Sequence, residues 1–269
     1  MVPMCDCQST PGLSRREVIA GSLVAGSLVA AAAGIAGVPR VAAAPAGPAV
    51  PALEVLPGLS IYPRDAWGAS LPPKGPLEVE TPQFLLVHHT ASPNSYTSAV
   101  TLIQATYFFH TSSAKNWPDV CYEFFIGRDG DVWEGRAGAM SGPVVADATG
   151  GSQGFAQLIC LLGDFTSELP TDAAQEALVK VLAWLAPRYS IDITPGATTS
   201  FISRGSQRWA AGTPVTTFTI AGHRDMSYTA CPGDAFYPVL PDIRTRAAAQ
   251  VEAWKSAIKP ARRLGLVTP

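Results

Sequence analysis

The run Phe84-Leu85-Leu86-Val87-His88-His89-Thr90 is the best single guide to the architecture of this 269-residue chain. Its four consecutive apolar residues predict a strand buried on both faces, as in the parallel sheets of α/β proteins. The strand ends at two histidines, and imidazole nitrogen is a common metal ligand. Because successive side chains of a strand point to opposite faces, only one of His88 and His89 can face a metal directly.

A second stretch, residues 222–234, places His223 and Cys231 eight residues apart in a segment rich in turn residues. Imidazole and thiolate are ligands that zinc prefers, and Pro232 and Gly233 favour a loop in which both can converge. Taken alone, a histidine and a cysteine at this spacing are more often a packed histidine and a buried thiol. With one histidine of the strand-end pair they would form a three-ligand site, which leaves a position open for water and is typical of catalytic zinc.

Further motifs follow one another in order along the chain, and they favour the zinc site over a packed histidine and a buried thiol. They are Tyr62-Pro63-Arg64-Asp65-Ala66-Trp67-Gly68-Ala69, Tyr122-Glu123-Phe124-Phe125-Ile126-Gly127-Arg128-Asp129-Gly130, Trp133-Glu134-Gly135-Arg136, Gly222-His223-Arg224-Asp225 and Thr229-Ala230-Cys231-Pro232-Gly233. Together with the strand-end histidines, they resemble the peptidoglycan recognition protein and N-acetylmuramoyl-L-alanine amidase type 2 family, which includes phage amidase-type lysozymes. The resemblance runs from about Tyr62 to about Trp254. Several motifs in the right order are far more specific than any one of them.

The resemblance implies a fold and a set of site residues. The fold is a single α/β domain with a central mixed, mostly parallel β-sheet flanked by helices and a zinc site in a surface groove. The family pattern assigns the zinc to His88, His223 and Cys231, and it implies that Tyr122 and Thr229 are catalytic residues beside the substrate carbonyl. Judged by its aromatic neighbours alone, Tyr122 would be a core residue. Many phage members carry Lys at the position of Thr229, so a cationic donor is missing there.

The activity that the resemblance implies is zinc-dependent hydrolysis of the amide bond between N-acetylmuramic acid and L-alanine in peptidoglycan. The alternative is a non-catalytic protein that only binds peptidoglycan; such members typically lose a zinc ligand, most often the cysteine, whereas Cys231 and Tyr122 are both present. A third interpretation, a zinc-stabilised structural protein, needs a fourth ligand, for which His89 and Asp225 are the nearby candidates. We expect Asp225 instead to orient His223 through a hydrogen bond.

The N-terminal region has the pattern of an export signal. Arg15 and Arg16 precede an Ala-, Gly- and Val-rich run, residues 18–38, with no charge until Arg40. This pattern resembles a twin-arginine signal peptide, and small residues near position 44 suit cleavage. A retained membrane anchor is the alternative, which the weak hydrophobicity of Ala and Gly disfavours. We therefore expect an exported protein, in the cell wall, the periplasm or the medium, with no stable membrane association after signal removal.

These patterns divide the chain into four parts. We predict a signal peptide over residues 1–44, a Pro-rich linker without regular structure over 45–59, the amidase domain over 60–256 and a loose C-terminal tail over 257–269. The net charge of −2 gives no electrostatic reason to expect nucleic acid as a partner. We expect a monomer whose partners are peptidoglycan or muropeptides.

The remaining histidine, two further cysteines and the predicted helices are expected to have structural roles. His110 follows Phe108 and Phe109 at the end of a predicted helix, so we expect a packed helix-end residue and not a ligand. Cys121 and Cys160 lie in apolar runs and are expected to be buried thiols, although an exported protein would permit a disulfide. Apolar spacing predicts helices over about 95–110, after residue 171 and from 241 onward, and a last strand over 216–221. The polar, turn-rich segment 191–217 has no predicted function.

Overall fold

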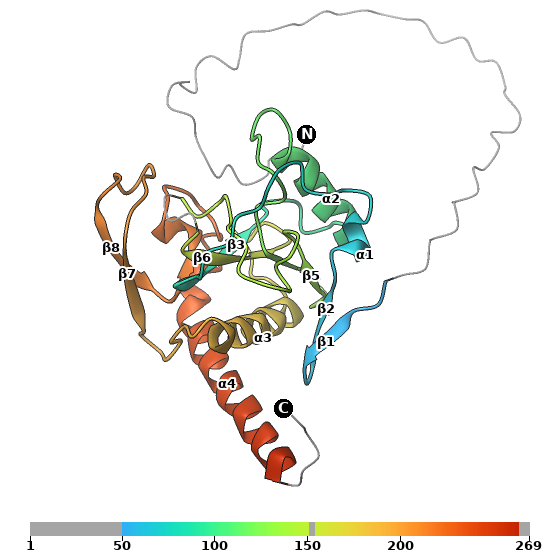
Figure 1. The fold of residues 1–269 in the computed structure, drawn as a ribbon, viewed down its shortest axis with the longest axis vertical. Helices are drawn as coiled ribbons and strands as arrows, with labels where there is room; N and C mark the ends of the chain where they lie inside the picture. Colours follow the sequence, from blue (N-terminus) through green and yellow to red (C-terminus); the bar gives the residue numbers. More distant parts are fainter. Residues whose placement is uncertain (1–49, 151–153, 264–269) are drawn as a thin grey trace, which may run out of the picture. The chain divides into compact units, whose positions relative to one another are not determined.

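A mixed β-sheet of seven strands lies at the centre of the part of the chain that the computed structural model describes, residues 50–150 and 154–263 (Figure 1). The strand order is β1 (Leu53–Leu56), β2 (Leu59–Tyr62), β5 (Val132–Glu134), β4 (Phe124–Ile126), β6 (Ala156–Leu161), β3 (Phe84–His89) and β9 (Ile220–Gly222). Pairing is parallel for β2–β5, β4–β6, β6–β3 and β3–β9, and antiparallel for β1–β2 and β4–β5. The prediction of a mixed, mostly parallel sheet in a single α/β domain is confirmed.

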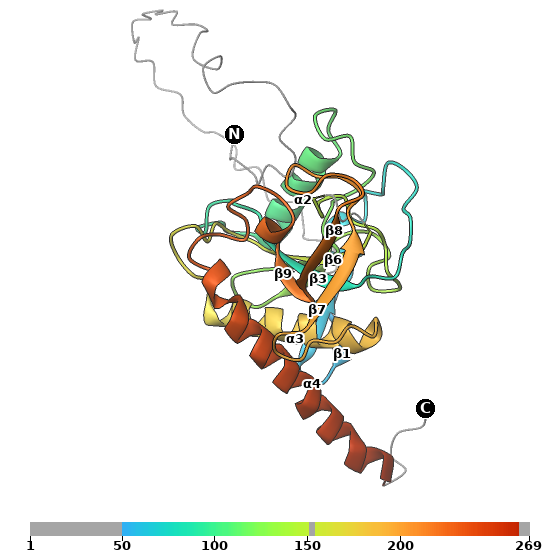
Figure 2. The same cartoon turned by 90° about the vertical axis from the view of Figure 1, so that its left-hand side faces the viewer.

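Strand β3 lies between β6 and β9, as Figure 2 shows, and all six of its residues are buried. Its side chains alternate between two hydrophobic clusters: Phe84 and Leu86 belong to one, and Leu85 and Val87 belong to the other. Both faces of the strand are therefore packed, which explains why its sequence is continuously apolar rather than alternating.

Helices cover both faces of the sheet (Figure 1). On the face of Leu85 lie α3 (Asp172–Arg188) and α4 (Leu240–Arg263), and on the face of Leu86 lies α2 (Ala99–His110), which packs against the short helix α1 (Asp65–Gly68). The hydroxyl oxygens of Ser98 and Thr171 cap α2 and α3 by accepting backbone N–H groups at 3.2 and 3.1 Å. Such caps satisfy donors that have no partner within a helix.

The polar segment 191–217 contains regular structure of its own. Strands β7 (Thr198–Ile202) and β8 (Pro214–Phe218) form an antiparallel hairpin that is a separate two-stranded sheet (Figures 1 and 2). After β9 the chain enters the short 3₁₀ helix η1 (His223–Asp225), and a second one, η2 (Tyr237–Val239), precedes α4. The hairpin thus lies directly before the segment that carries His223.

Three predictions about element boundaries are wrong. The expected linker 45–59 contains β1, because Pro51 and Pro57 flank the strand instead of interrupting it, and the carbonyl of Pro57 accepts a hydrogen bond from Trp254 Nε1 at 3.1 Å. The expected loose tail from residue 257 continues α4 to Arg263, a segment in which the helix formers Ala, Lys and Arg outnumber the single Pro260. The expected strand 216–221 is divided between β8 and β9.

One prediction about the N-terminal region depends on residues beyond the described part. The predicted signal peptide, residues 1–44, lies outside the described residues. Among the helices that the structure does describe, none combines the length and the apolar character needed to cross a membrane.

Candidate metal centre

Three side chains that could bind one metal ion meet at the end of β3. Parallel pairing places Val87 of β3 beside Gly222 of β9, so the next residues, His88 and His223, emerge together from neighbouring strands. The ring centroids of these two histidines are 4.3 Å apart, and Nδ1 of His88 lies 3.6 Å from Sγ of Cys231. One nitrogen or sulfur atom from each of the three residues lies within 4.8 Å of the other two, and all three residues are wholly buried.

The hydrogen-bonding state of these side chains fits a metal ion. Nε2 of His88 and both ring nitrogens of His223 are buried and have no hydrogen-bond partner among the described residues. Leaving a buried polar atom unpaired costs about 1–3 kcal/mol, a cost that coordination would remove. Burial lowers the pKa of His223 to about 3 and that of His88 well below its usual value, so both rings are neutral at pH 7. Two neutral imidazoles and a cysteine are a donor set that suits zinc.

His89 lies on the opposite face of β3 and is satisfied by the protein. Its Nδ1 accepts the backbone N–H of Phe165 at 3.2 Å, and its own backbone N–H donates to Sγ of Cys231 at 3.3 Å. Within the described residues, the cluster of potential ligands around Cys231 contains only His88 and His223 besides the cysteine. The fourth protein ligand that a closed structural zinc site requires is not found there.

Tyr122 and Thr229, the residues implied to be catalytic, both lie near the three potential ligands. The ring of Tyr122 is buried, with its centroid 5.1 Å from that of His88, so it is at once a core residue and a neighbour of a potential ligand. The hydroxyl oxygen of Thr229 accepts the backbone N–H of Cys231 at 3.2 Å. Thr229 also borders a cavity of about 390 Å³ on the protein surface. The expected zinc site in an open groove is thus not seen as such, because the three potential ligands are buried. The surface cavity borders their loop through Thr229.

Residues 222–234, which we call the metal loop, are held in shape by Arg224 and Asp225. The backbone N–H of Arg224 donates to the carbonyl of Cys231 at 3.0 Å, and its guanidinium contacts Asp234 at 2.7 Å. The carboxylate of Asp225 accepts the backbone N–H of Gly222 at 2.9 Å and the hydroxyl of Tyr237 at 2.5 Å. The prediction that Asp225 orients His223 is therefore wrong, because the 3₁₀ turn directs its carboxylate back to Gly222.

The β7–β8 turn, residues 203–213, contains site neighbours that the sequence did not reveal. Arg208 and Trp209 on this turn donate to backbone carbonyls of the metal loop. The paired groups are 16 residues apart in sequence and meet only because the hairpin folds over the loop. No local spacing signals such a contact. The remaining histidine, His110, accepts the backbone N–H of Cys121 at 3.2 Å and is the packed helix-end residue that was predicted.

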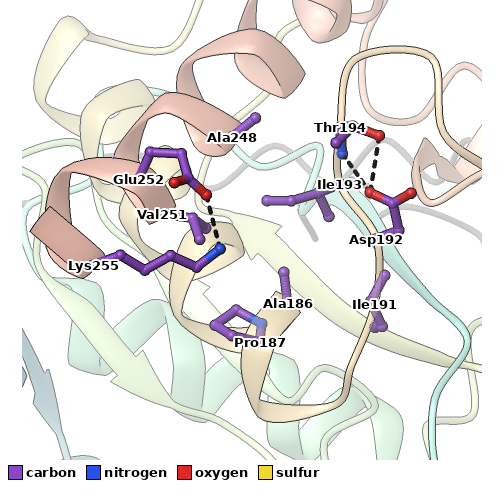
Figure 3. Close-up of a pocket in the computed structure, with 10 residues that line it drawn as sticks. All are labelled: Ala186, Pro187, Ile191, Asp192, Ile193, Thr194, Ala248, Val251, Glu252 and Lys255. Carbon is purple, nitrogen blue, oxygen red and sulfur yellow. Dashed lines mark hydrogen bonds and ion pairs between the residues drawn. The ribbon is translucent and has the colours of Figure 1, made fainter.

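A different crevice, of about 260 Å³, lies between the end of α3, the segment after it and α4 (Figure 3). Its walls include the aliphatic side chains of Ile191, Ile193 and Val251. Its polar groups are already paired, Asp192 with Thr194 and Glu252 with Lys255. It is lined by neither histidine nor cysteine, and α3 and α4 cover the face of the sheet opposite to His88. This crevice has no part in the candidate metal centre.

Comparisons with known proteins show which family and which fold this chain resembles. A family model described as N-acetylmuramoyl-L-alanine amidase, Amidase_2, matches residues 78–234. The N-acetylmuramoyl-L-alanine amidase of Sus scrofa is 30% identical over 186 residues, which are 67% of this chain and 27% of that protein. Peptidoglycan recognition protein 1 of Bos taurus is 30% identical over 188 residues, 67% of this chain and 82% of that protein. A solved structure of Drosophila PGRP-LB in complex with tracheal cytotoxin has a TM-score of 0.51 at 24% identity, covering 67% of this chain and 92% of that one.

The extent of these matches decides what they show. The chain spans only 27–30% of the length of three mammalian amidases that it matches, so it is similar to one part of those proteins. The family match, by contrast, begins before β3 and ends at Asp234, the last residue of the metal loop, and it therefore includes the whole candidate metal centre. On the strength of this match over more than half of its length, the chain belongs to the Amidase_2 family of N-acetylmuramoyl-L-alanine amidases.

Proposed function

We propose that this protein is a zinc-dependent N-acetylmuramoyl-L-alanine amidase, which hydrolyses the amide bond between N-acetylmuramic acid and L-alanine in peptidoglycan. The observation that carries the proposal is the buried group of His88, His223 and Cys231, in which three ring nitrogens have no hydrogen-bond partner among the described residues. A protein that only bound peptidoglycan would have no need to maintain this costly arrangement.

The three ligand residues would hold the zinc and keep it reactive. Zinc with an open coordination position supplies a Lewis acid and lowers the pKa of water to about 7. Burial keeps His88 and His223 neutral and able to bind. The backbone N–H of His89, 3.3 Å from the sulfur of Cys231, favours the thiolate form by donating a hydrogen bond to it.

Two hydroxyl groups would act on the substrate carbonyl. Tyr122 lies beside His88, and its phenol would donate a hydrogen bond to the carbonyl oxygen as negative charge develops there. The hydroxyl oxygen of Thr229 accepts the backbone N–H of Cys231, and its O–H would donate to the substrate carbonyl. A neutral hydroxyl stabilises an oxyanion less than an ammonium group does, so Thr229 has the smaller role.

Properties of the relatives support peptidoglycan as the substrate. The relatives named above include amidases and a peptidoglycan recognition protein, and the PGRP-LB structure holds the muropeptide tracheal cytotoxin. A non-catalytic binding protein is the competing function within this family, and the complete ligand set favours the enzyme. Peptidoglycan lies outside the cytoplasmic membrane, which agrees with the export signal predicted from Arg15 and Arg16.

The test is to digest purified peptidoglycan with the full chain and identify the products by mass spectrometry. We expect peptides with a free N-terminal L-alanine and glycans with intact N-acetylmuramic acid. A chelator should abolish their release, and added zinc should restore it. Cys231→Ala should be inactive, whereas Cys160→Ala, which removes another buried thiol, should be active. Binding of peptidoglycan by the zinc-loaded protein without any cleavage would overturn the proposal.

A further inference from the structure

The β7–β8 turn is fixed to the metal loop by three side-chain hydrogen bonds. Ser206 Oγ donates to the carbonyl of Met226 at 3.2 Å, Trp209 Nε1 donates to the carbonyl of Asp225 at 3.2 Å, and the guanidinium of Arg208 donates to the carbonyl of Arg224. The three acceptors are consecutive residues of the metal loop. The turn is therefore held in one position beside the loop, and its other side chains are placed there with it.

The surface cavity of about 390 Å³ lies where the turn meets the metal loop. It is lined by Arg208, Arg224, Asp225, Ser227, Tyr228, Thr229 and Tyr237. Thr229 is two residues from the potential ligand Cys231, so a group bound in the cavity would lie next to the candidate metal centre. Of the residues that line the cavity, the proposed function gives a role on the substrate to Thr229.

The charges around the cavity leave one cation uncompensated. The guanidinium of Arg224 pairs with Asp234 at 2.7 Å, and the carboxylate of Asp225 is occupied by Gly222 and Tyr237. Arg208 is exposed, and the described residues place no carboxylate within ion-pair distance of it.

Two aromatic side chains shape the surroundings of this cation. The guanidinium carbon of Arg208 lies 5.2 Å from the ring centroid of Trp209, which restricts its orientation. Tyr228, on the cavity wall, is 72% exposed, so its ring is accessible to a bound group. An oriented cation next to an exposed aromatic ring is suited to an anionic group attached to a short apolar segment.

We propose that this cavity is a subsite for a carboxylate of the stem peptide of peptidoglycan, with Arg208 binding the carboxylate and Tyr228 packing against the aliphatic part beside it. The planar guanidinium matches a carboxylate through two parallel hydrogen bonds, which a lysine could not supply. The inference rests on the proposed function, since it assigns specificity to the same site. The segment 191–217, which had no predicted function, thereby becomes a specificity element.

The experiment compares two synthetic muramyl peptides that differ only in a free carboxylate or a carboxamide at the end of the peptide. A hydrogen bond to a charged group contributes about 1.5–3 kcal/mol, so we expect the wild type to prefer the acid by roughly 10- to 100-fold in kcat/KM, mainly through KM. Arg208→Gln should remove this preference, so that the ratio of the two kcat/KM values falls to about one. Arg208→Lys should retain part of it.

Controls separate recognition from support of the metal loop. If Arg208 only braced the loop, Arg208→Gln would lower zinc content and kcat equally for both peptides and would leave the ratio unchanged, which would overturn the subsite. Arg246 is a partly exposed arginine of α4 that pairs with Glu176 and Asp242, and Arg246→Gln should keep the wild-type ratio.

The outcomes for the subsite and for the amidase activity are distinguishable. Equal kcat/KM of the wild type for the acid and the amide would contradict the subsite alone. Cleavage of neither peptide would contradict the proposed function. In that case the affinities of the same two peptides are measured by calorimetry. Tighter binding of the acid by the wild type, with no such difference in Arg208→Gln, supports the subsite. Equal affinity of the wild type for both peptides overturns it.

Discussion

His88 and His89 are adjacent residues of the same type, both buried at the end of β3, yet the protein uses them differently. The ring of His89 accepts the backbone N–H of Phe165, and its own N–H supports Cys231. The ring of His88 lies beside His223 and Cys231, and its Nε2 has no partner in the described part of the chain. Unsatisfied hydrogen-bonding capacity, and not residue type or burial, distinguishes the potential ligand from the structural histidine.

The difference follows from the strand itself. Successive side chains of β3 enter opposite faces of the sheet, so one histidine must enter the α2 face and the other the face covered by α3 and α4. The metal loop returns to the α2 face because β9 pairs with β3 in parallel, with Gly222 opposite Val87. One residue of displacement in β3 would exchange the positions of the two histidines.

Replacing each histidine in turn gives the largest expected effect. His88→Ala should reduce zinc from about one ion per chain to nearly none and abolish activity while the protein remains folded, because two protein ligands bind zinc far more weakly than three. His89→Ala should keep the zinc but lower the melting temperature by several degrees, since an unpaired buried N–H at Phe165 costs about 1–3 kcal/mol. Metal analysis and thermal unfolding measure both effects. Loss of zinc only in His89→Ala would reverse the comparison.

The next effect concerns the residue that contacts the ring of His88. Tyr122→Phe keeps the packed ring and removes the hydroxyl, so kcat should fall by roughly 10²–10³-fold, as for the loss of an oxyanion donor, with zinc content unchanged. Tyr107→Phe is the matched control, because the hydroxyl of Tyr107 donates to the carbonyl of Pro72, away from the ligands, and its loss should leave kcat unaltered. Equal rates for wild type and Tyr122→Phe would return Tyr122 to a purely structural role.

A smaller effect is expected at Thr229. Thr229→Val preserves the shape of the side chain but removes the acceptor for the Cys231 N–H and the donor proposed for the substrate, so kcat should fall by about tenfold. Thr245→Val, in an exposed residue of α4, is the control and should retain full activity. A decrease in kcat for Thr229→Val as large as that for Tyr122→Phe would show that the two hydroxyls have equal roles.

The smallest effect is expected at Glu123, and it shows whether every unpaired buried polar atom belongs to a metal ligand. Glu123 is wholly buried, one carboxyl oxygen accepts the backbone N–H of Leu158 at 2.6 Å and the other has no partner among the described residues. Burial raises the pKa of Glu123 from 4.5 to about 8, despite the opposing influence of Arg136. The folded protein therefore binds this proton more tightly than the unfolded chain, and the stability that it contributes is lost as the pH rises from about 4.5 through 8.

The variant Glu123→Gln should remove that dependence. Its melting temperature should exceed that of the wild type at pH 9 by a few degrees and differ little at pH 5, while zinc content and kcat at neutral pH stay the same. Thermal unfolding across this pH range is the measurement. A change in zinc content would link Glu123 to the metal centre and weaken the distinction drawn from His88 and His89.

Parts of the fold and of the site were predictable because their signals are local. A continuous apolar run located β3, and the spacing of apolar residues located the three long helices. The hairpin formed by β7 and β8 could not be foreseen, since half of its strand residues are Thr or Ser and its contacts with the metal loop join segments that are distant in sequence. Asp225 was misassigned for a similar reason: its partners, Gly222 and Tyr237, depend on a 3₁₀ turn that composition does not reveal.

By itself, the sequence determined that residues 84–89 form a strand buried on both faces, because a run of four large apolar residues can only be stabilised between two packed layers. It also determined that a histidine and a cysteine share one loop, and its ordered motifs indicated the family. Only the tertiary structure decided how His88 meets that loop and which turn flanks it. Strands β3 and β9 are more than 130 residues apart in sequence, and they pair because both faces of the sheet must pack at once. No local stretch of sequence reveals this pairing.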